Sequence, residues 1–286
     1  DSIVGSSVIR LILNTPSDIP FSRISNRSKD MQIWLGINQE PHIFIDKNGV
    51  NVDIIREDPD TIYFEKFLQI VREQIQDKIT ETNLVAPLGL DPLNNVIYTD
   101  FSKPMSPHLL AGGTSGSGKS VTINSIILSM MCLYTEEQVQ FLFIDPKKVE
   151  FTMFKNKRHT IDVVTDIEEA VLKLDELVDE MEKRYTVFAE KGATNLEEYT
   201  KYCKGKMPRI VLVFDEFADF MTGSSDTKKQ VEEAIQRLGA KARAAGIHLI
   251  VSTQSPKADI INTNIRNNLP CRLALKTADA TASTVI

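Results

Sequence analysis

The sequence contains few of the residues that build disulfide frameworks or metal centres. Among its 286 residues are three cysteines and four histidines, and both kinds are scattered without the spacing of a metal site. Isolated cysteines are typical of a reducing compartment, which argues against a secreted, disulfide-stabilised protein. We therefore expect a cytoplasmic protein whose histidines are structural.

Long apolar runs and a positive net charge are lacking as well. No stretch approaches the ~20 apolar residues that span a bilayer, and no secretory signal peptide is visible. The net charge is −6, whereas a protein that coats nucleic acid is usually basic. Binding to nucleic acid would therefore need a local surface, such as the lining of a ring. The first residue is Asp1 rather than Met, so we expect an excerpt of a longer protein, for which a membrane anchor stays open.

A glycine-rich stretch from Gly113 to Ser120 fits G-x-x-x-x-G-K-[ST], the phosphate-binding loop (P-loop). Glycines let the backbone approach a triphosphate closely, and successive N–H groups then point at the phosphate oxygens. Lys119 offers a cation to the β- and γ-phosphates, and the Ser120 hydroxyl is suited to hold Mg²⁺. The predicted ATP-binding residues are Gly113, Thr114, Ser115, Gly116, Ser117, Gly118, Lys119, Ser120 and Val121.

The flanks of this loop support the match. Residues 108–111 are apolar and predict a short buried strand, and residues 121–133 predict a helix whose amino end faces the phosphates. A glycine-serine linker that matches the pattern by chance is the alternative, and the strand–loop–helix context disfavours it.

Strand and helix patterns alternate after the loop. Buried strands are predicted at residues 141–144, 163–164, 210–214, 248–253 and 272–275, and helices at residues 166–191, 195–203 and 226–245. This alternation predicts an α/β fold with a mostly parallel, doubly wound sheet, which is the fold of a P-loop ATPase domain.

The first part of the chain predicts a separate small α+β domain. Its strands are expected at residues 8–13, 42–46 and 50–55, and its helices at residues 23–35 and 61–78. In the first of these helices Ile24, Met31 and Trp34 are the expected buried positions. We place the domain division at residues 1–84 and 85–286.

An acidic pair, Asp215 and Glu216, follows the apolar run 210–214. Beside a P-loop, such a pair predicts hydrolysis: Asp215 would order a water on the Mg²⁺ held by Ser120, and Glu216 would act as the general base. Taken alone, the pair is also compatible with a solvated turn or a helix N-cap.

Two further polar residues lie at element ends. Gln254 follows the strand 248–253, where an amide can contact the γ-phosphate; its alternative is a strand-end hydrogen bond. Arg243 lies near a helix end, where a cation is favoured in any case. In a ring it would reach a neighbour's γ-phosphate.

Several segments resemble the FtsK/SpoIIIE family of DNA translocases. They are residues 108–120, 144–147, 163–166, 180–185, 213–219, 241–248, 252–256 and 268–272. The sequence Lys-Ala-Arg-Ala-Ala-Gly-Ile-His at 241–248 is very close to the family pattern, whereas Ser255 replaces the usual arginine. The resemblance covers residues 84–286 and continues more weakly upstream, where residues 24–27 resemble the α domain that precedes the family's RecA-like β domain.

The resemblance implies a homo-oligomeric, hexameric ring that hydrolyses ATP with Mg²⁺ and pumps double-stranded DNA through its pore. Carried over, the P-loop and Ser120 bind ATP and Mg²⁺, Asp215 and Glu216 form the hydrolytic pair, Gln254 is the sensor and Arg243 is the trans arginine finger. The loop from Lys257 to Arg266 corresponds to the pore segment. Its DNA-contact candidates are Lys257, Thr263, Asn264 and Arg266, which suit phosphate contacts without base reading.

Two departures leave alternatives open. The family's closing glycine- and acid-rich segment and its winged-helix γ domain are not among these 286 residues, and the first domain fits the family only loosely. The alternative function is a secretion or conjugation coupling ATPase that moves a protein or nucleoprotein. A nucleotide-gated scaffold without hydrolytic work is the third interpretation.

Overall fold

The computed structural model describes residues 1–16, 18–221, 223–258 and 260–286, and in it the chain forms two compact units. The first comprises Asp1–Gln76 and Gly89–Ile97, and the second comprises Asp77–Leu88 and Tyr98–Ile286. The predicted division at residues 84 and 85 stays a prediction. Ser17, in the turn predicted after the first strand, and Asp259, in the predicted pore segment, lie outside the described residues.

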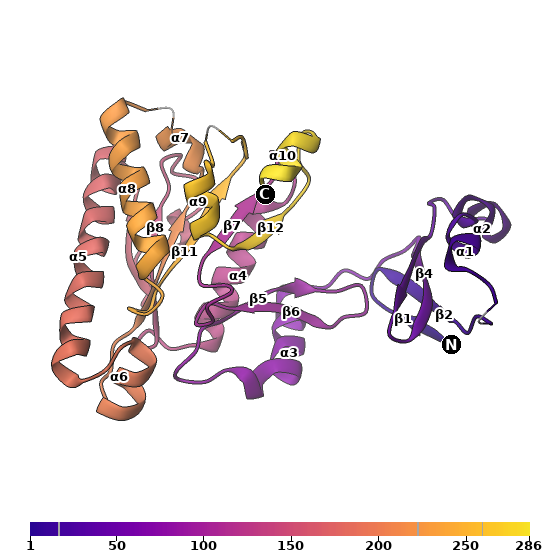
Figure 1. Cartoon of the computed structure of the whole chain (residues 1–286), viewed down its shortest axis with the longest axis horizontal. Coiled ribbons are helices and arrows are strands. Elements are labelled where there is room, and N and C mark those ends of the chain that lie inside the picture. The colour runs from indigo at the N-terminus through magenta and orange to yellow at the C-terminus, as the bar shows by residue number, and fades with distance from the viewer. Residues whose placement is uncertain (17, 222, 259) are drawn as a thin grey trace. The chain divides into compact units, whose positions relative to one another are not determined.

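The first unit is built on a four-stranded antiparallel sheet of order β1-β2-β4-β3 (Figure 1). Its strands are β1 (Ser2–Val4), β2 (Val8–Leu13), β3 (His42–Asp46) and β4 (Gly49–Ile55). Strands β3 and β4 pair as a hairpin, with Asp46 opposite Gly49. Helix α3 (Phe64–Ile75) follows and buries Phe67, Val71 and Ile75 on one face. A 3-10 turn (Gln76–Lys78) continues it.

The prediction of one helix over residues 23–35 is wrong. The structure has two shorter helices, α1 (Phe21–Ser25) and α2 (Ser28–Leu35), which are separated at Asn26 and Arg27. This break puts Ile24 on a different helix from Met31 and Trp34, so the three residues no longer form one stripe. None of the three is buried, and Trp34 is 74% exposed.

The second unit is organised around a six-stranded, all-parallel sheet of order β12-β7-β11-β10-β8-β9. In chain order the strands are β7 (Leu109–Gly112), β8 (Val139–Ile144), β9 (Thr160–Val164), β10 (Arg209–Phe214), β11 (Ile247–Thr253) and β12 (Cys271–Ala274). A separate two-stranded sheet pairs β5 (Val85–Leu90) with β6 (Val96–Asp100). The parallel sheet confirms the expected α/β fold class.

Helices cover both faces of this sheet, as Figure 1 shows for the second unit. Successive side chains of β10 alternate between two apolar clusters: Leu212 and Phe214 pack with α5 and α8, and Val211 and Val213 pack with α4. The helices are α4 (Lys119–Leu133), α5 (Ile167–Lys191), α6 (Leu196–Cys203), α7 (Phe217–Met221), α8 (Ser225–Lys241), α9 (Thr263–Asn268) and α10 (Ala280–Val285). A short 3-10 helix spans Thr152–Phe154.

The longest helix, α5, agrees closely with its sequence pattern. The Asp166 carboxylate caps it by accepting from the backbone N–H groups of Glu168 and Glu169, and Gly192 ends it with a left-handed φ of 70°. Its apolar residues at helical spacing run from Ile167 to Phe188, and this spacing predicts core packing. All of them except Ile167 and Tyr185 are buried, and those from Ala170 to Met181 lie in the same apolar core as the sheet.

Two histidines are fully buried at the amino-terminal end of the sheet. His108 accepts a hydrogen bond from the Leu249 backbone N–H at 3.1 Å, and His248 Nδ1 donates to the Pro107 carbonyl at 3.1 Å. Burial lowers the pKa of His108 to about 4, and burial also places the pKa of His248 well below its ordinary value. Both side chains are thus neutral in the folded protein near pH 7.

We expect the free energy of unfolding to fall as the pH falls from about 6.5 to about 4. The unfolded chain binds protons at these histidines near pH 6.5, whereas His108 in the folded chain binds one only near pH 4. The stabilising contribution is therefore complete above pH 6.5 and is lost on acidification, by about 3 kcal/mol for His108. Urea unfolding followed by circular dichroism from pH 7 to pH 4 measures this. A His108→Gln variant should show a shallower slope; an unchanged slope would contradict the assignment.

Candidate nucleotide-binding site

The P-loop joins β7 to α4 in a conformation that requires its glycines. Gly116 and Gly118 have φ values of 76° and 89°, in the left-handed region that glycine adopts without strain. A Cβ built on Gly113 would lie 2.6 Å from Ser117 Oγ and 2.8 Å from Leu275 Cβ, which is closer than packed atoms approach. The loop therefore forms a narrow backbone cradle.

Neighbouring segments fix the start of this loop. The Gly113 N–H donates to the Thr253 carbonyl at 3.3 Å, at the end of β11. The Thr114 N–H and hydroxyl both donate to the Lys276 carbonyl, at 2.9 and 3.1 Å. These bonds hold the loop at the carboxyl-terminal edge of the sheet, where ligands bind in open α/β folds.

The P-loop lysine is paired with the first acid of the predicted hydrolytic pair. Lys119 Nζ lies 2.8 Å from Asp215 Oδ1 and 2.8 Å from Ser252 Oγ, and the Ser252 hydroxyl donates to the same carboxylate oxygen at 2.7 Å. All three side chains are buried, and they come from α4 and from the ends of β10 and β11. An incoming phosphate would compete with Asp215 for the lysine.

The second acid, Glu216, is held by the strand end beside it. Its carboxylate accepts from the Gln254 backbone N–H at 3.1 and 3.3 Å and from the Thr253 hydroxyl at 3.2 Å. Its φ of 50° is a rare conformation for a residue with a Cβ, and such strain is typical of functional positions. Glu216 is buried.

Lys147, which follows β8, is the cation beside Glu216. Its Nζ lies 3.3 Å from Glu216 Oε2 and 3.7 Å from Asp219 Oδ2. Burial acts to lower the pKa of Lys147, but the charges of Glu216 and Asp219 outweigh this effect and the pKa is raised. Burial in turn raises the pKa of Asp219. Asp215 and Glu216 thus each contact a lysine of their own.

A cavity of about 230 Å³ lies over the P-loop. Its lining comprises Thr114, Ser115, Gly116, Gly118, Lys119, Ser120, Val121, Glu150 and Gln254. The structure therefore brings most of the predicted ATP-binding residues and Gln254 together around one space. It also places both acids directly after β10, where Asp215 contacts Lys119 and Glu216 contacts Gln254.

The residues fit an ATP-bound Mg²⁺ ion better than a protein-built metal centre. Mg²⁺ prefers oxygen ligands and usually keeps several waters, with one or two protein groups and the substrate phosphates. Ser120 lines the nucleotide cavity and the Asp215 carboxylate lies beside Lys119, so both oxygen donors are present. Within the described ranges, no group of three or more His, Cys, Asp or Glu side chains is arranged to hold a metal.

Arg243 is the one predicted catalytic residue that lies away from this cavity. It lies in the turn between α8 and β11, at the amino-terminal edge of the sheet, whereas the P-loop is at the carboxyl-terminal edge. The seven residues of β11 separate the two edges by about 20 Å. Arg243 therefore cannot reach a nucleotide held by its own P-loop.

The segment predicted as a pore loop is partly helical. Helix α9 begins at Thr263, and Ile260, Ile261 and Ile265 are buried in the apolar core that contains α8. Ile261 and Ile265, four residues apart and both buried, anchor this segment, so the expected loop is in part a helix. Of the candidates for DNA contact, Lys257, Thr263 and Asn264 are exposed, and Arg266 is half-buried with its guanidinium 3.3 Å from Thr263 Oγ1.

Sequence reasoning did not assign a role to three residues of this site. Ser252 connects Lys119 to Asp215, Lys147 pairs with Glu216, and Glu150 lines the nucleotide cavity. The signal for Ser252 was a hydroxyl at the carboxyl end of a strand whose centre is apolar. The signal for Lys147 was its place at the end of a buried strand.

Similar proteins are known over nearly the whole length of this chain. The model of the FtsK/SpoIIIE family matches residues 70–258. DNA translocase FtsK of Streptococcus pneumoniae (strain ATCC BAA-255 / R6) is 37% identical over 99% of this chain, which covers 37% of that protein. DNA translocase FtsK of Campylobacter jejuni (strain ATCC 700819 / NCTC 11168) is 36% identical over 99% of this chain, which covers 30% of that protein. The chain thus spans about a third of the length of these relatives.

Two solved structures share the fold. The pCW3 conjugation coupling protein TcpA, in monomer form with ATPγS, is 26% identical and superposes with a TM-score of 0.66 over 100% of this chain and 79% of its own. The cytoplasmic domain of the Type VII secretion ATPase EccC of Thermomonospora curvata is 26% identical, with a TM-score of 0.62 over 71% of this chain and 25% of its own. These matches and the family model confirm the expected P-loop ATPase.

Proposed function

The chain belongs to the FtsK/SpoIIIE family, and from this premise we propose that it is the motor part of an ATP-driven translocase of double-stranded DNA. The observation that carries the proposal is the pairing of Lys119 with Asp215 beneath the P-loop, next to a buried Glu216. A loop that only bound nucleotide would not need the second acid. Placed together, these groups can bind a triphosphate and activate a water.

The contacts indicate how the site would work. An incoming γ-phosphate would compete with Asp215 for Lys119. Ser120 would hold the Mg²⁺, and Asp215 would order one of its waters. Bound Mg²⁺ supplies charge neutralisation on the phosphate oxygens. Glu216, held at the end of β10, takes the proton of the attacking water. Because the Gln254 backbone N–H bonds Glu216 directly, a movement of Glu216 is transmitted to the segment after Gln254.

The position of Arg243 supports an oligomer. The nucleotide cavity lies at one edge of the sheet and Arg243 at the other, so a trans arginine finger requires head-to-tail contact between copies. A head-to-tail interface that closes generates a ring, and we propose a hexamer. The segment from Lys257 to Arg266 would then contact DNA phosphates in the pore, through Lys257, Thr263, Asn264 and Arg266.

The test is ATP hydrolysis with and without long duplex DNA. At low salt we expect duplex DNA to raise kcat for ATP severalfold, and the rise should diminish as salt increases, because phosphate contacts release counterions. The dependence on salt is the control for non-specific effects. A complete protein that hydrolyses ATP at the same rate with and without duplex at low salt would contradict a DNA motor.

The structural likeness to TcpA and EccC favours a second candidate, a conjugation or secretion coupling ATPase. In that case the client is a protein or nucleoprotein, and a net charge of −6 is natural. The higher identity to DNA translocases, 37% against 26%, favours DNA. Hydrolysis that rises with peptide and is indifferent to DNA would reverse this choice.

A further inference from the structure

Protein donors occupy both carboxylate oxygens of Glu216, the proposed general base. A carboxylate has about four acceptor sites, two on each oxygen. Oε1 accepts from the Thr253 hydroxyl at 3.2 Å and from the Gln254 backbone N–H at 3.1 Å. Oε2 accepts from the same N–H and from Lys147 Nζ, both at 3.3 Å. The acceptor sites that a water would need are therefore taken by the protein itself.

Glu216 is also shielded from the nucleotide cavity. It is 3% exposed, and the described residues that line the cavity over the P-loop do not include it. Gln254, whose N–H bonds the carboxylate, does line that cavity. A general base must come within hydrogen-bond distance of the proton that it takes. At least one of the contacts to Glu216 therefore has to open before a water can be activated.

The donors at the end of β11 are fixed in place. Thr253 is fully buried, and its hydroxyl also accepts from the Ser255 N–H at 3.1 Å. The Thr253 carbonyl accepts from the Gly113 N–H at 3.3 Å. The Gln254 N–H belongs to the next residue of the same backbone. These donors and Glu216 thus form one unit, whose internal contacts persist when it moves.

Lys147 differs from the other donors in place and in exposure. It follows β8, which lies on the side of β10 opposite β11. Its side chain is 42% exposed, and lysine carries its charge on a flexible four-carbon stem. Asp219 Oδ2, at 3.7 Å, is a second acid within reach of the same ammonium group. Because Asp219 or water can receive the ammonium, the contact with Lys147 is the one that can open.

We propose that Lys147 restrains Glu216 in the protein without DNA and thereby keeps its hydrolysis of ATP slow. The inference rests on the proposed function, in which Glu216 is the general base and duplex DNA accelerates hydrolysis. The segment after Gln254 carries the proposed DNA contacts, and the Gln254 N–H bonds Glu216. A displacement of this segment by DNA moves Glu216 relative to Lys147, and Oε2 then accepts from a water. Lys147 is thus a positioning residue that acts through Glu216.

The test is Lys147→Met, which removes the ammonium group and keeps a long side chain. Without DNA, the variant should hydrolyse ATP severalfold faster than the wild-type protein, at about the rate that the wild type reaches with duplex DNA. Adding duplex should then raise the rate little further. The affinity for a fluorescent ATP analogue should be unchanged, because the P-loop and Lys119 are intact, and this binding also shows that the variant is folded.

Lys147→Arg separates a restraint by charge from a structural role. Arginine keeps the positive charge beside Glu216, so this variant should return to slow hydrolysis without DNA and to stimulation by duplex. Damage to packing would slow hydrolysis in both variants. Loss of the restraint accelerates Lys147→Met alone.

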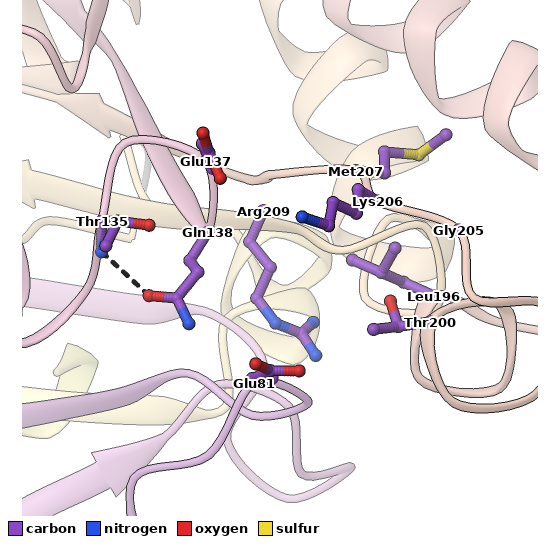
Figure 2. Close-up of a pocket in the computed structure, with 10 residues that line it drawn as sticks. All are labelled: Glu81, Thr135, Glu137, Gln138, Leu196, Thr200, Gly205, Lys206, Met207 and Arg209. Carbon is purple, nitrogen blue, oxygen red and sulfur yellow. Dashed lines mark hydrogen bonds between the residues drawn. The ribbon is translucent and has the colours of Figure 1, made fainter.

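The matched control is Lys206→Met, which changes the net charge by the same amount at the opposite edge of the sheet. Lys206 is exposed. Figure 2 shows it in the lining of a cavity of about 280 Å³, to which Arg209, the first residue of β10, also contributes. The length of β10 separates this cavity from Glu216, so Lys206→Met should hydrolyse ATP at the wild-type rates with and without DNA.

The outcomes distinguish this restraint from the proposed DNA motor. A Lys147→Met variant with slow hydrolysis in the absence of DNA and full stimulation by duplex would overturn the restraint and leave the motor intact. Hydrolysis that falls with and without DNA, and that Lys147→Arg recovers, would also overturn it, because the lysine would then assist the reaction. If duplex stimulates neither protein and Lys147→Met is still the faster, the restraint on Glu216 is supported and the proposed DNA client fails.

Discussion

Replacing Arg243 by alanine is expected to lower turnover by about 10³- to 10⁵-fold, the range observed when a trans arginine is removed from a phosphoryl-transfer site. The affinity for ATP should change little, because Arg243 lies at the sheet edge opposite its own P-loop, about 20 Å away. Steady-state hydrolysis with duplex DNA, together with titration of a fluorescent ATP analogue, separates the two effects.

The trans assignment has its own test. Arg243→Ala copies keep an intact P-loop and Glu216, whereas Glu216→Gln copies keep an intact arginine. When the two inactive variants are mixed at equal amounts, hydrolysis should return at interfaces where an intact P-loop and Glu216 of one copy face an intact Arg243 of the next. Arg237→Ala is the matched control: it removes an exposed arginine from α8 whose guanidinium is 3.6 Å from Glu182, and it should stay active. Inactive mixtures would exclude trans action.

The parts of this site that could be predicted from the sequence are those encoded locally. The P-loop is defined by a run of eight residues whose glycine positions and flanking strand and helix are all contiguous. Asp215 and Glu216 follow the apolar run 210–214, so their place at the sheet edge follows from the fold class alone. Helix α5 could also be predicted, because its N-terminal cap, its apolar stripe and its terminal glycine all indicate the same helix.

The contacts that could not be predicted join residues distant in sequence. Ser252 contacts Asp215 and Lys119 only because β11 lies between β10 and β7 in the sheet. The order of the strands cannot be predicted from any local sequence pattern. Lys147 reaches Glu216 because β8 is the other neighbour of β10. At residues 23–35 the local pattern misled, because a break at Asn26 and Arg27 divides the expected helix in two and leaves Ile24, Met31 and Trp34 unburied.

Replacing Glu216 by glutamine should lower kcat by about 10²- to 10⁴-fold, the usual contribution of a general base. The amide has the same shape and can still accept from the Gln254 N–H and the Thr253 hydroxyl, so the strand end should keep its structure. It cannot take a proton from water. ATP and duplex DNA should therefore still bind, and the complex should stall. Single-turnover hydrolysis and DNA retention on a filter measure the two properties.

The matched control for this change is Asp219→Asn, because Asp219 shares Lys147 with Glu216 but is more exposed. The Asp219→Asn change removes one ion pair of Lys147 and leaves the Glu216 carboxylate unchanged, so hydrolysis should continue. A Glu216→Gln variant that keeps full biological activity would contradict a motor and favour a nucleotide-gated scaffold. Such a scaffold needs bound ATP and does not need its hydrolysis. A Glu216→Gln variant that loses ATP binding would instead show that Glu216 supports the P-loop through its contact with Gln254. Glu216 would then not be the general base.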